Sequence, residues 1–108
     1  MILFLRNSKN RTIVDCECYV KTENEKKFIE ISVDINISAY SEFLLGHPND
    51  AHNIIFDFTV IQNLRSWLWE RYFVGEDNDP EKYLDVIGEL RKLFTDMTHK
   101  YNLYYVED

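Results

Sequence analysis

The chain has 108 residues, 45% of them hydrophobic and 15% aromatic, which is enough apolar material for the core of one domain and excludes a disordered chain. Its formal net charge of −7 disfavours nucleic acids and anionic membranes as partners, because both are bound through lysine and arginine. We therefore expect a single acidic domain over residues 1–108, with a basic protein as the partner that its charge would attract.

Targeting signals are not apparent in the sequence. The apolar segment 1–5 is shorter than the core of a signal peptide, and no segment approaches the length of a membrane span. Cys16 and Cys18 are separated by one residue, which is not the framework of an extracellular disulfide scaffold. These features predict a cytoplasmic protein.

The first forty residues carry the alternation typical of β-strands. Residues 1–5 are expected to form a short strand and residues 7–10 a turn. Residues 12–21 and 27–40 alternate apolar and polar side chains, the period of a strand with one face in the core and one in water. The polar segment between them predicts a hairpin.

The second half of the chain is mostly helical in pattern. We expect a loop over residues 46–52, and either a short strand or the approach to a helix over residues 53–58. Residues 59–73 have helical spacing, and Asp79 followed by Pro80 predicts the start of a second helix that continues to about residue 100. Residues 103–106 are expected to form a closing strand.

The order of these elements predicts an α+β fold. Three or four mainly antiparallel strands would form a small sheet, with two helices packed on one face, in the order β-β-β-(β)-α-α-β. This arrangement follows because each element has a single apolar face to bury.

The polar face of the hairpin is the main candidate site. A loop of about four residues predicts a register that places Asp15 opposite Asp34, Glu17 opposite Ser32 and Tyr19 opposite Glu30. Neighbouring registers also bring two carboxylates opposite each other, which destabilises a sheet. A cationic partner would relieve this repulsion. The alternative interpretation is a solvated face on which the side chains splay apart.

Two further segments extend this candidate surface. The segment 67–73 is too apolar for one helix stripe, so Trp69 is expected on a separate flank, where it either covers a sheet edge or anchors a partner. Glu76 and Asp77 either continue the acidic surface or only mark the end of a helix. Their spacing does not match a calcium loop.

Catalytic and metal-binding patterns are weak. Cys16 and Cys18 together with His47 and His52 have zinc-binding chemistry, but alternation on an inward strand face favours buried cysteines. A metal-dependent nuclease would use Asp15 with Glu25 and Lys27. We expect no catalytic residues and no cofactor.

These observations favour a binding module over an enzyme. The profile resembles in type the small acidic bacterial immunity proteins, and the leading interpretation is an inhibitor that neutralises a basic toxin such as a nuclease. The alternatives are a small metal-dependent hydrolase that uses the hairpin carboxylates, and a non-catalytic, oligomer-forming accessory subunit. The expected partner-binding residues are Asp15, Glu17, Tyr19, Glu30, Asp34, Trp69, Glu76 and Asp77.

Overall fold

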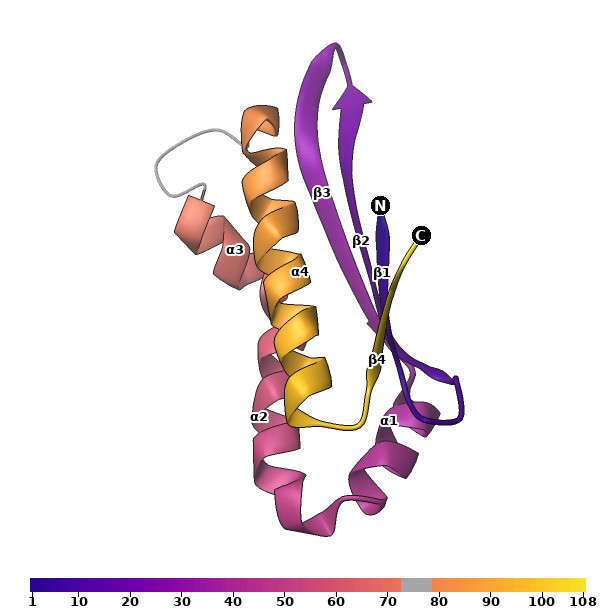
Figure 1. The fold of residues 1–108 in the computed structure, drawn as a ribbon. Coiled ribbons are helices and arrows are strands. Elements are labelled where there is room, and N and C mark those ends of the chain that lie inside the picture. The colour runs from indigo at the N-terminus through magenta and orange to yellow at the C-terminus, as the bar shows by residue number, and fades with distance from the viewer. Residues whose placement is uncertain (73–78) are drawn as a thin grey trace.

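A four-stranded antiparallel sheet forms one layer of the protein, in a computed structural model that describes residues 1–72 and 79–108 (Figure 1). The strands lie in the order β3-β2-β1-β4 and every neighbouring pair is antiparallel. Their bounds are β1 Ile2–Arg6, β2 Thr12–Glu23, β3 Lys26–Ile35 and β4 Tyr104–Glu107. The predicted α+β class is confirmed, including the closing strand at the C-terminal end.

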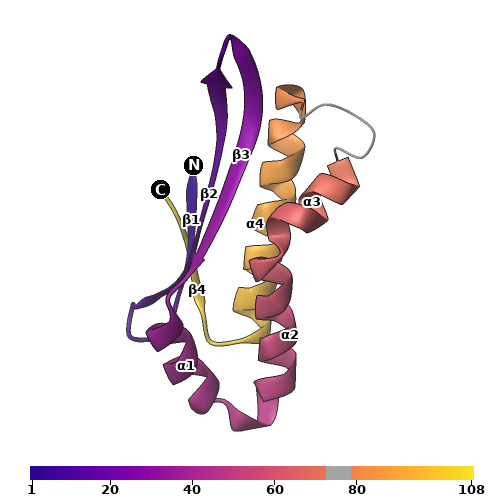
Figure 2. The ribbon, with the colours of Figure 1, turned by 180° about the vertical axis from the view of Figure 1, so that it is seen from behind.

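Helices cover only one face of this sheet (Figures 1 and 2). Helices α2, α3 and α4 lie on that face, whereas α1 lies beyond one end of the strands. Among the described residues, no helix lies on the other face, which we call the uncovered face. The bounds are α1 Ile37–Leu45, α2 Ala51–Gln62, α3 Leu64–Tyr72 and α4 Tyr83–Lys100, with short 3-10 turns at Pro48–Asp50 and Pro80–Lys82.

The strand predicted over residues 27–40 ends earlier than expected. Asn36 is the N-cap of α1, and its side-chain oxygen accepts a hydrogen bond from the backbone nitrogen of Ala39 at 3.1 Å. An asparagine cap satisfies a helix donor that would otherwise lack a partner, and this favours a helix start over a longer strand. Ile37, expected on the apolar strand face, is therefore 69% exposed.

The single helix predicted over residues 59–73 is two helices. Helix α2 begins at Ala51 and ends at Gln62, and its C-cap Asn63, with φ of −98° and ψ of 15°, separates it from α3. The core stripe of α2 starts at Ile54, so residues 53–58 are helical and not a strand. Much of the loop predicted over residues 46–52 is the 3-10 turn and the first turn of α2.

Helix α4 supplies the central apolar stripe, which consists of Val86, Ile87, Leu90, Phe94 and Met97. The predicted cap is present on the 3-10 turn Pro80–Lys82 that leads into α4, because the Asp79 side chain accepts a hydrogen bond from the backbone nitrogen of Glu81 at 2.9 Å and Pro80 follows at the first position of that turn. The α-helix itself begins at Tyr83. This stripe belongs to one hydrophobic core with the inward side chains of the sheet, among them Leu3, Leu5 and Cys16.

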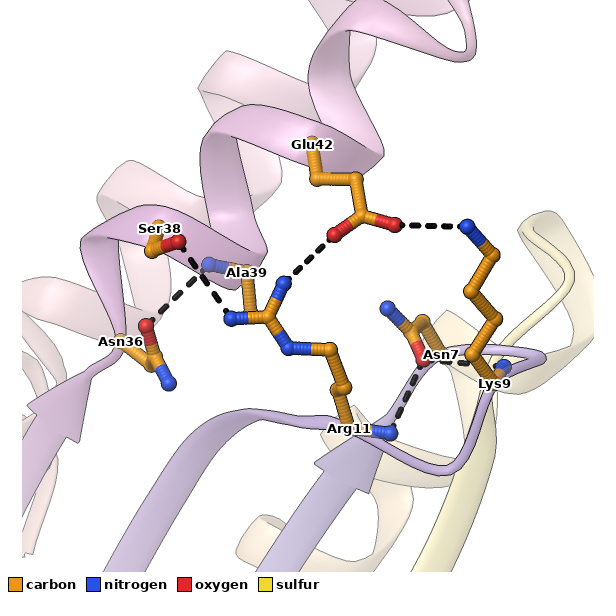
Figure 3. A network of polar contacts seen from close by, with 7 residues as sticks. All are labelled: Asn7, Lys9, Arg11, Asn36, Ser38, Ala39 and Glu42. Carbon is orange, nitrogen blue, oxygen red and sulfur yellow. Dashed lines mark hydrogen bonds and ion pairs between the residues drawn. The ribbon is translucent and has the colours of Figure 1, made fainter.

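A polar network fixes α1 to the turn between β1 and β2 (Figure 3). The Glu42 carboxylate accepts hydrogen bonds from Lys9 Nζ at 3.1 Å and Arg11 Nη1 at 2.5 Å. The Asn7 side chain accepts from the backbone nitrogens of both basic residues, at 3.0 and 2.9 Å, and so holds the turn. Hydrogen bonds from Lys9 and then Arg11 lower the pKa of Glu42.

Candidate functional site

The β2–β3 hairpin has the predicted register. Asp15 pairs with Asp34, Glu17 with Ser32 and Tyr19 with Glu30. The connection is a two-residue turn and not four residues, because Glu23 already pairs with Lys26. Its central residues, Asn24 and Glu25, have φ values of 51° and 67°, the backbone signs of a type I′ turn. The hairpin also extends well past β1 (Figure 1).

Three carboxylates gather on the uncovered face, and no described residue supplies a compensating cation. Asp15 and Asp34 are cross-strand neighbours, and Glu17 is the next residue of β2 on the same face. Within residues 1–72 and 79–108, none of the three forms an ion pair. Burial raises the pKa of Asp15, and the charges of Asp34 and Glu17 raise it further. We call Asp15, Glu17 and Asp34 the acidic cluster.

Glu30 differs from the acidic cluster because its charge is already compensated. Lys21 Nζ lies 3.1 Å from Glu30 Oε2, and both side chains are about half exposed. An exposed pair of this kind contributes little to stability, about 0–1 kcal/mol. Tyr19, the cross-strand neighbour of Glu30, is 36% exposed. Both residues lie on the uncovered face, farther towards the hairpin tip than the acidic cluster.

Apolar side chains continue the row of carboxylates across the sheet. Phe4 of β1 pairs with Asp15 on one side and with Val106 of β4 on the other, so one row reads Asp34, Asp15, Phe4, Val106. The Arg6 guanidinium lies 5.2 Å from the centre of the Phe4 ring. Phe4 was not among the residues predicted from the sequence, although its alternation with Leu3 and Leu5, which are buried, places it on the other face.

Trp69 lies on the helical side of the molecule and not beside the acidic cluster. It is 45% exposed and lines a cleft of about 450 Å³ between α3 and β3, together with Arg65 and residues 28–31. The expected alternative that Trp69 covers a sheet edge fits this position. Trp67 is 37% exposed, whereas Leu64 and Leu68 are fully buried. The two remaining predicted residues, Glu76 and Asp77, lie outside the described residues.

The geometry does not assemble the metal sites considered from the sequence. Within the described part of the chain, no group of three or more histidine, cysteine, aspartate or glutamate side chains is arranged to hold a metal ion. Asp15 and Glu25 are separated by about 30 Å of extended strand, so they cannot share an ion in the nuclease arrangement. His47, which follows α1, has its Nδ1 atom 2.9 Å from the carbonyl oxygen of Phe43 in that helix.

Both cysteines are buried on the inward face of β2, as predicted. Burial raises the pKa of Cys16 to about 12, with a smaller contribution from Cys18, and raises the pKa of Cys18 to about 11. Thiols with these pKa values are almost entirely protonated at neutral pH, and the thiolate is the reactive form. The pair therefore belongs to the core.

We expect both thiols to resist alkylation in the folded protein. Because a pKa raised by two units lowers the thiolate fraction about a hundredfold, iodoacetamide at pH 8 should label the native protein at least about a hundredfold more slowly than the unfolded protein. Intact-mass spectrometry with and without concentrated guanidinium chloride measures both rates. Rapid labelling of the native protein would show that the helices do not cover this part of β2.

Comparison with known proteins identifies no relative. No protein-family model matches the chain, and neither the curated proteins nor the solved structures contain a match. In the described residues, no helix is both long enough and apolar enough to cross a membrane.

Proposed function

We propose that the chain is a protein-binding module whose uncovered sheet face docks a positively charged protein surface. In its most concrete form it is an immunity protein or inhibitor that covers the phosphate-binding cleft of a basic toxin such as a nuclease. One observation carries this proposal: Asp15 and Asp34 lie directly opposite each other, with Glu17 beside them, on the uncovered face. No described cation compensates them.

The electrostatic cost of this arrangement supports a docking role. Like charges on opposed sheet positions destabilise the fold by a few tenths of a kcal/mol to about 1 kcal/mol. The cost is present in the free protein and is relieved when a lysine or arginine of a partner approaches the acidic cluster. The net charge of −7 adds long-range attraction, which speeds encounter with a basic protein.

The apolar end of the same row supplies the apolar contact area that the carboxylates do not provide. Phe4 and Val106 are half-buried beside the carboxylates, and Tyr104 on the same face is 54% exposed. Burial of apolar and aromatic side chains lowers the dissociation rate, whereas exposed charges act mainly on the association rate. The row thus combines an electrostatic end and an apolar end within one continuous surface.

A capture experiment with matched baits tests the proposal. The baits are the wild type, the variant Asp15→Asn/Asp34→Asn, and a control variant Asp85→Asn/Asp96→Asn, which removes the same charge from exposed positions of α4. In a lysate of the source organism, we expect the wild type and the control to retain one basic protein at low salt and release it at high salt. The sheet variant should not retain it.

Three results would contradict the proposal. Equal retention by all three baits would show that the acidic cluster is not the contact surface, and no basic protein on the wild type would remove the partner class. A second copy of the chain, retained regardless of salt, would indicate the oligomer-forming subunit instead.

A further inference from the structure

A second pocket lies in the helical layer, away from the uncovered face. It has a volume of about 430 Å³ and is lined by Asp50, Asn53, Phe56, Asp57, Lys100 and Tyr101. These residues come from the first half of α2 with the 3-10 turn before it, and from the C-terminal end of α4, which lies beside the middle of α2 (Figures 1 and 2). The size falls within the range of small-ligand sites, about 300–1,000 Å³.

Asp57 is a charged side chain held rigidly within this pocket. The residue is only 9% exposed, and its Oδ2 atom accepts a hydrogen bond from the Tyr101 hydroxyl at 2.6 Å. Burial, together with this hydrogen bond, raises the pKa of Tyr101 well above its usual range, so the hydroxyl remains a donor. The bond fixes the orientation of the carboxylate before any ligand arrives.

Lys100 holds Asp57 only loosely. Its Nζ atom lies 3.4 Å from both carboxylate oxygens, at the long end of a hydrogen bond, and the lysine side chain is 56% exposed. A long and flexible side chain in this position can swing into solvent at little cost. The contact therefore shows that the Asp57 carboxylate accepts a cationic group. Because Lys100 is held loosely, another cation can take its place.

The remaining groups of the pocket also favour a cation. Asp50 adds a second carboxylate and has no ion pair among the described residues. The positive N-terminal end of α2 and the negative C-terminal end of α4 meet here and offset each other. Two carboxylates then face one ammonium group. Phe56 is 69% exposed, and its ring face can receive a cation.

We propose that this pocket binds a guanidinium or alkylammonium group, which takes the place of the Lys100 ammonium on Asp57. The group belongs either to a free small molecule or to an arginine or lysine side chain of another protein. Asp57 and Asp50 pair with its charge, the Asn53 amide oxygen accepts a hydrogen bond, and Phe56 covers it from the solvent side. The site is separate from the acidic cluster, so it stands independently of the proposed function.

Butylguanidinium and butylurea are matched probes for this site, because they have nearly the same shape and differ in charge. Titrations of the ¹⁵N-labelled protein at constant ionic strength, followed by backbone amide shifts, measure binding. We expect butylguanidinium to give saturable shifts at the first turns of α2 and at residues 98–101. Butylurea should give none.

Three variants test the roles of individual residues. Lys100→Gln removes the competing ammonium and should tighten butylguanidinium binding by up to about fivefold. Asp57→Asn keeps an acceptor for Tyr101 but removes the charge, and should weaken binding by at least about tenfold. Asp85→Asn, which removes one charge from an exposed position at the other end of α4, should leave the titration unchanged.

The Lys100→Gln variant keeps the proposal falsifiable even if Asp57→Asn is unstable, because residue 100 is largely exposed. Saturable shifts in neither the wild type nor Lys100→Gln would overturn the proposal, and Asp57 would then serve only to join two helices. Equal shifts with butylurea would also overturn it. A blocked Gly-Arg-Gly peptide distinguishes the sources: binding at least as tight as that of butylguanidinium indicates a protein side chain, and weaker binding indicates a free small molecule.

Discussion

Truncation of Leu90 to alanine is expected to lower the free energy of unfolding by about 3–5 kcal/mol, whereas the same truncation at Leu84 should change it by less than about 0.5 kcal/mol. Both residues lie on α4, but Leu90 is fully buried and Leu84 is 77% exposed. Removal of a buried leucine side chain loses its transfer free energy and leaves a cavity. At the exposed position neither loss occurs.

Urea denaturation measures both changes, with the fluorescence of the partly exposed Trp67 and Trp69 as the signal. The two variants are matched in chemistry and in secondary structure, so the difference between them reports only which side of α4 faces the core. A typical domain has only about 5–15 kcal/mol of total stability, so the Leu90 variant should be close to unfolding. Similar losses at both positions would contradict the orientation of α4.

Replacement of Asp34 by lysine is expected to stabilise the fold and to abolish docking. The change converts a repulsive cross-strand pair with Asp15 into an attractive one, which should raise the free energy of unfolding by about 0.5 kcal/mol. The same change places a cation in the acidic cluster, and affinity for the basic partner should fall by at least about thirtyfold. Equilibrium denaturation and a binding titration with the captured partner provide the two measurements.

The gain in the free energy of unfolding of Asp34→Lys depends on pH through the pKa of Asp15. Because that pKa is raised in the folded protein, the ionised carboxylate opposes folding, and its effect on stability worsens as pH rises through the folded pKa. The gain in the lysine variant should therefore be present at neutral pH and vanish in acid. Glu42, whose pKa is lowered, acts in the opposite sense, because its contribution is lost as pH falls through its folded pKa.

A constant gain from neutral to acidic pH would show that repulsion between carboxylates is not its cause. Asp34→Asn is the control, because it removes the repulsion without introducing a new attraction. It should therefore give a smaller gain than the lysine variant. High salt should reduce the gain of both variants, since the side chain of residue 34 is exposed.

The hairpin was predictable because the pattern that determines it lies within two adjacent segments of the sequence. Alternation over β2 and β3 determines which face of each strand is buried, and a shift of one residue would expose the whole apolar set. The short polar connection then limits the remaining registers to a few, of which Asp15 opposite Asp34 is the observed one. The acidic cluster followed directly from the sequence for this reason.

The helical half and the second pocket were less predictable. They depend on competition between strand and helix formation and on contacts between residues that lie far apart in the sequence. Asn36 is a polar residue that fits the alternating pattern, so the pattern predicts that the strand continues through it. Only the hydrogen bond of its side chain as an N-cap shows that α1 begins there. Asp57 and Tyr101 are separated by 44 positions, and no local pattern indicates that they meet. The break between α2 and α3 at Asn63 is not marked by a glycine or a proline in the sequence either.

The overhang of the hairpin divides its backbone into two zones of different hydrogen-exchange behaviour. Near Cys16 the β2 backbone has strand neighbours on both sides, so its amide protons should exchange only through extensive unfolding. Near Thr22 it has a neighbour on one side and exposed side chains around it, and local opening of the tip should release those protons much sooner. Tyr19 lies at the boundary between the zones. A partner bound at the acidic cluster would raise the free energy of the unfolding through which the core amides exchange, and would therefore slow the protected zone. The overhanging tip, which opens locally, would keep its fast exchange unless the partner also covers it.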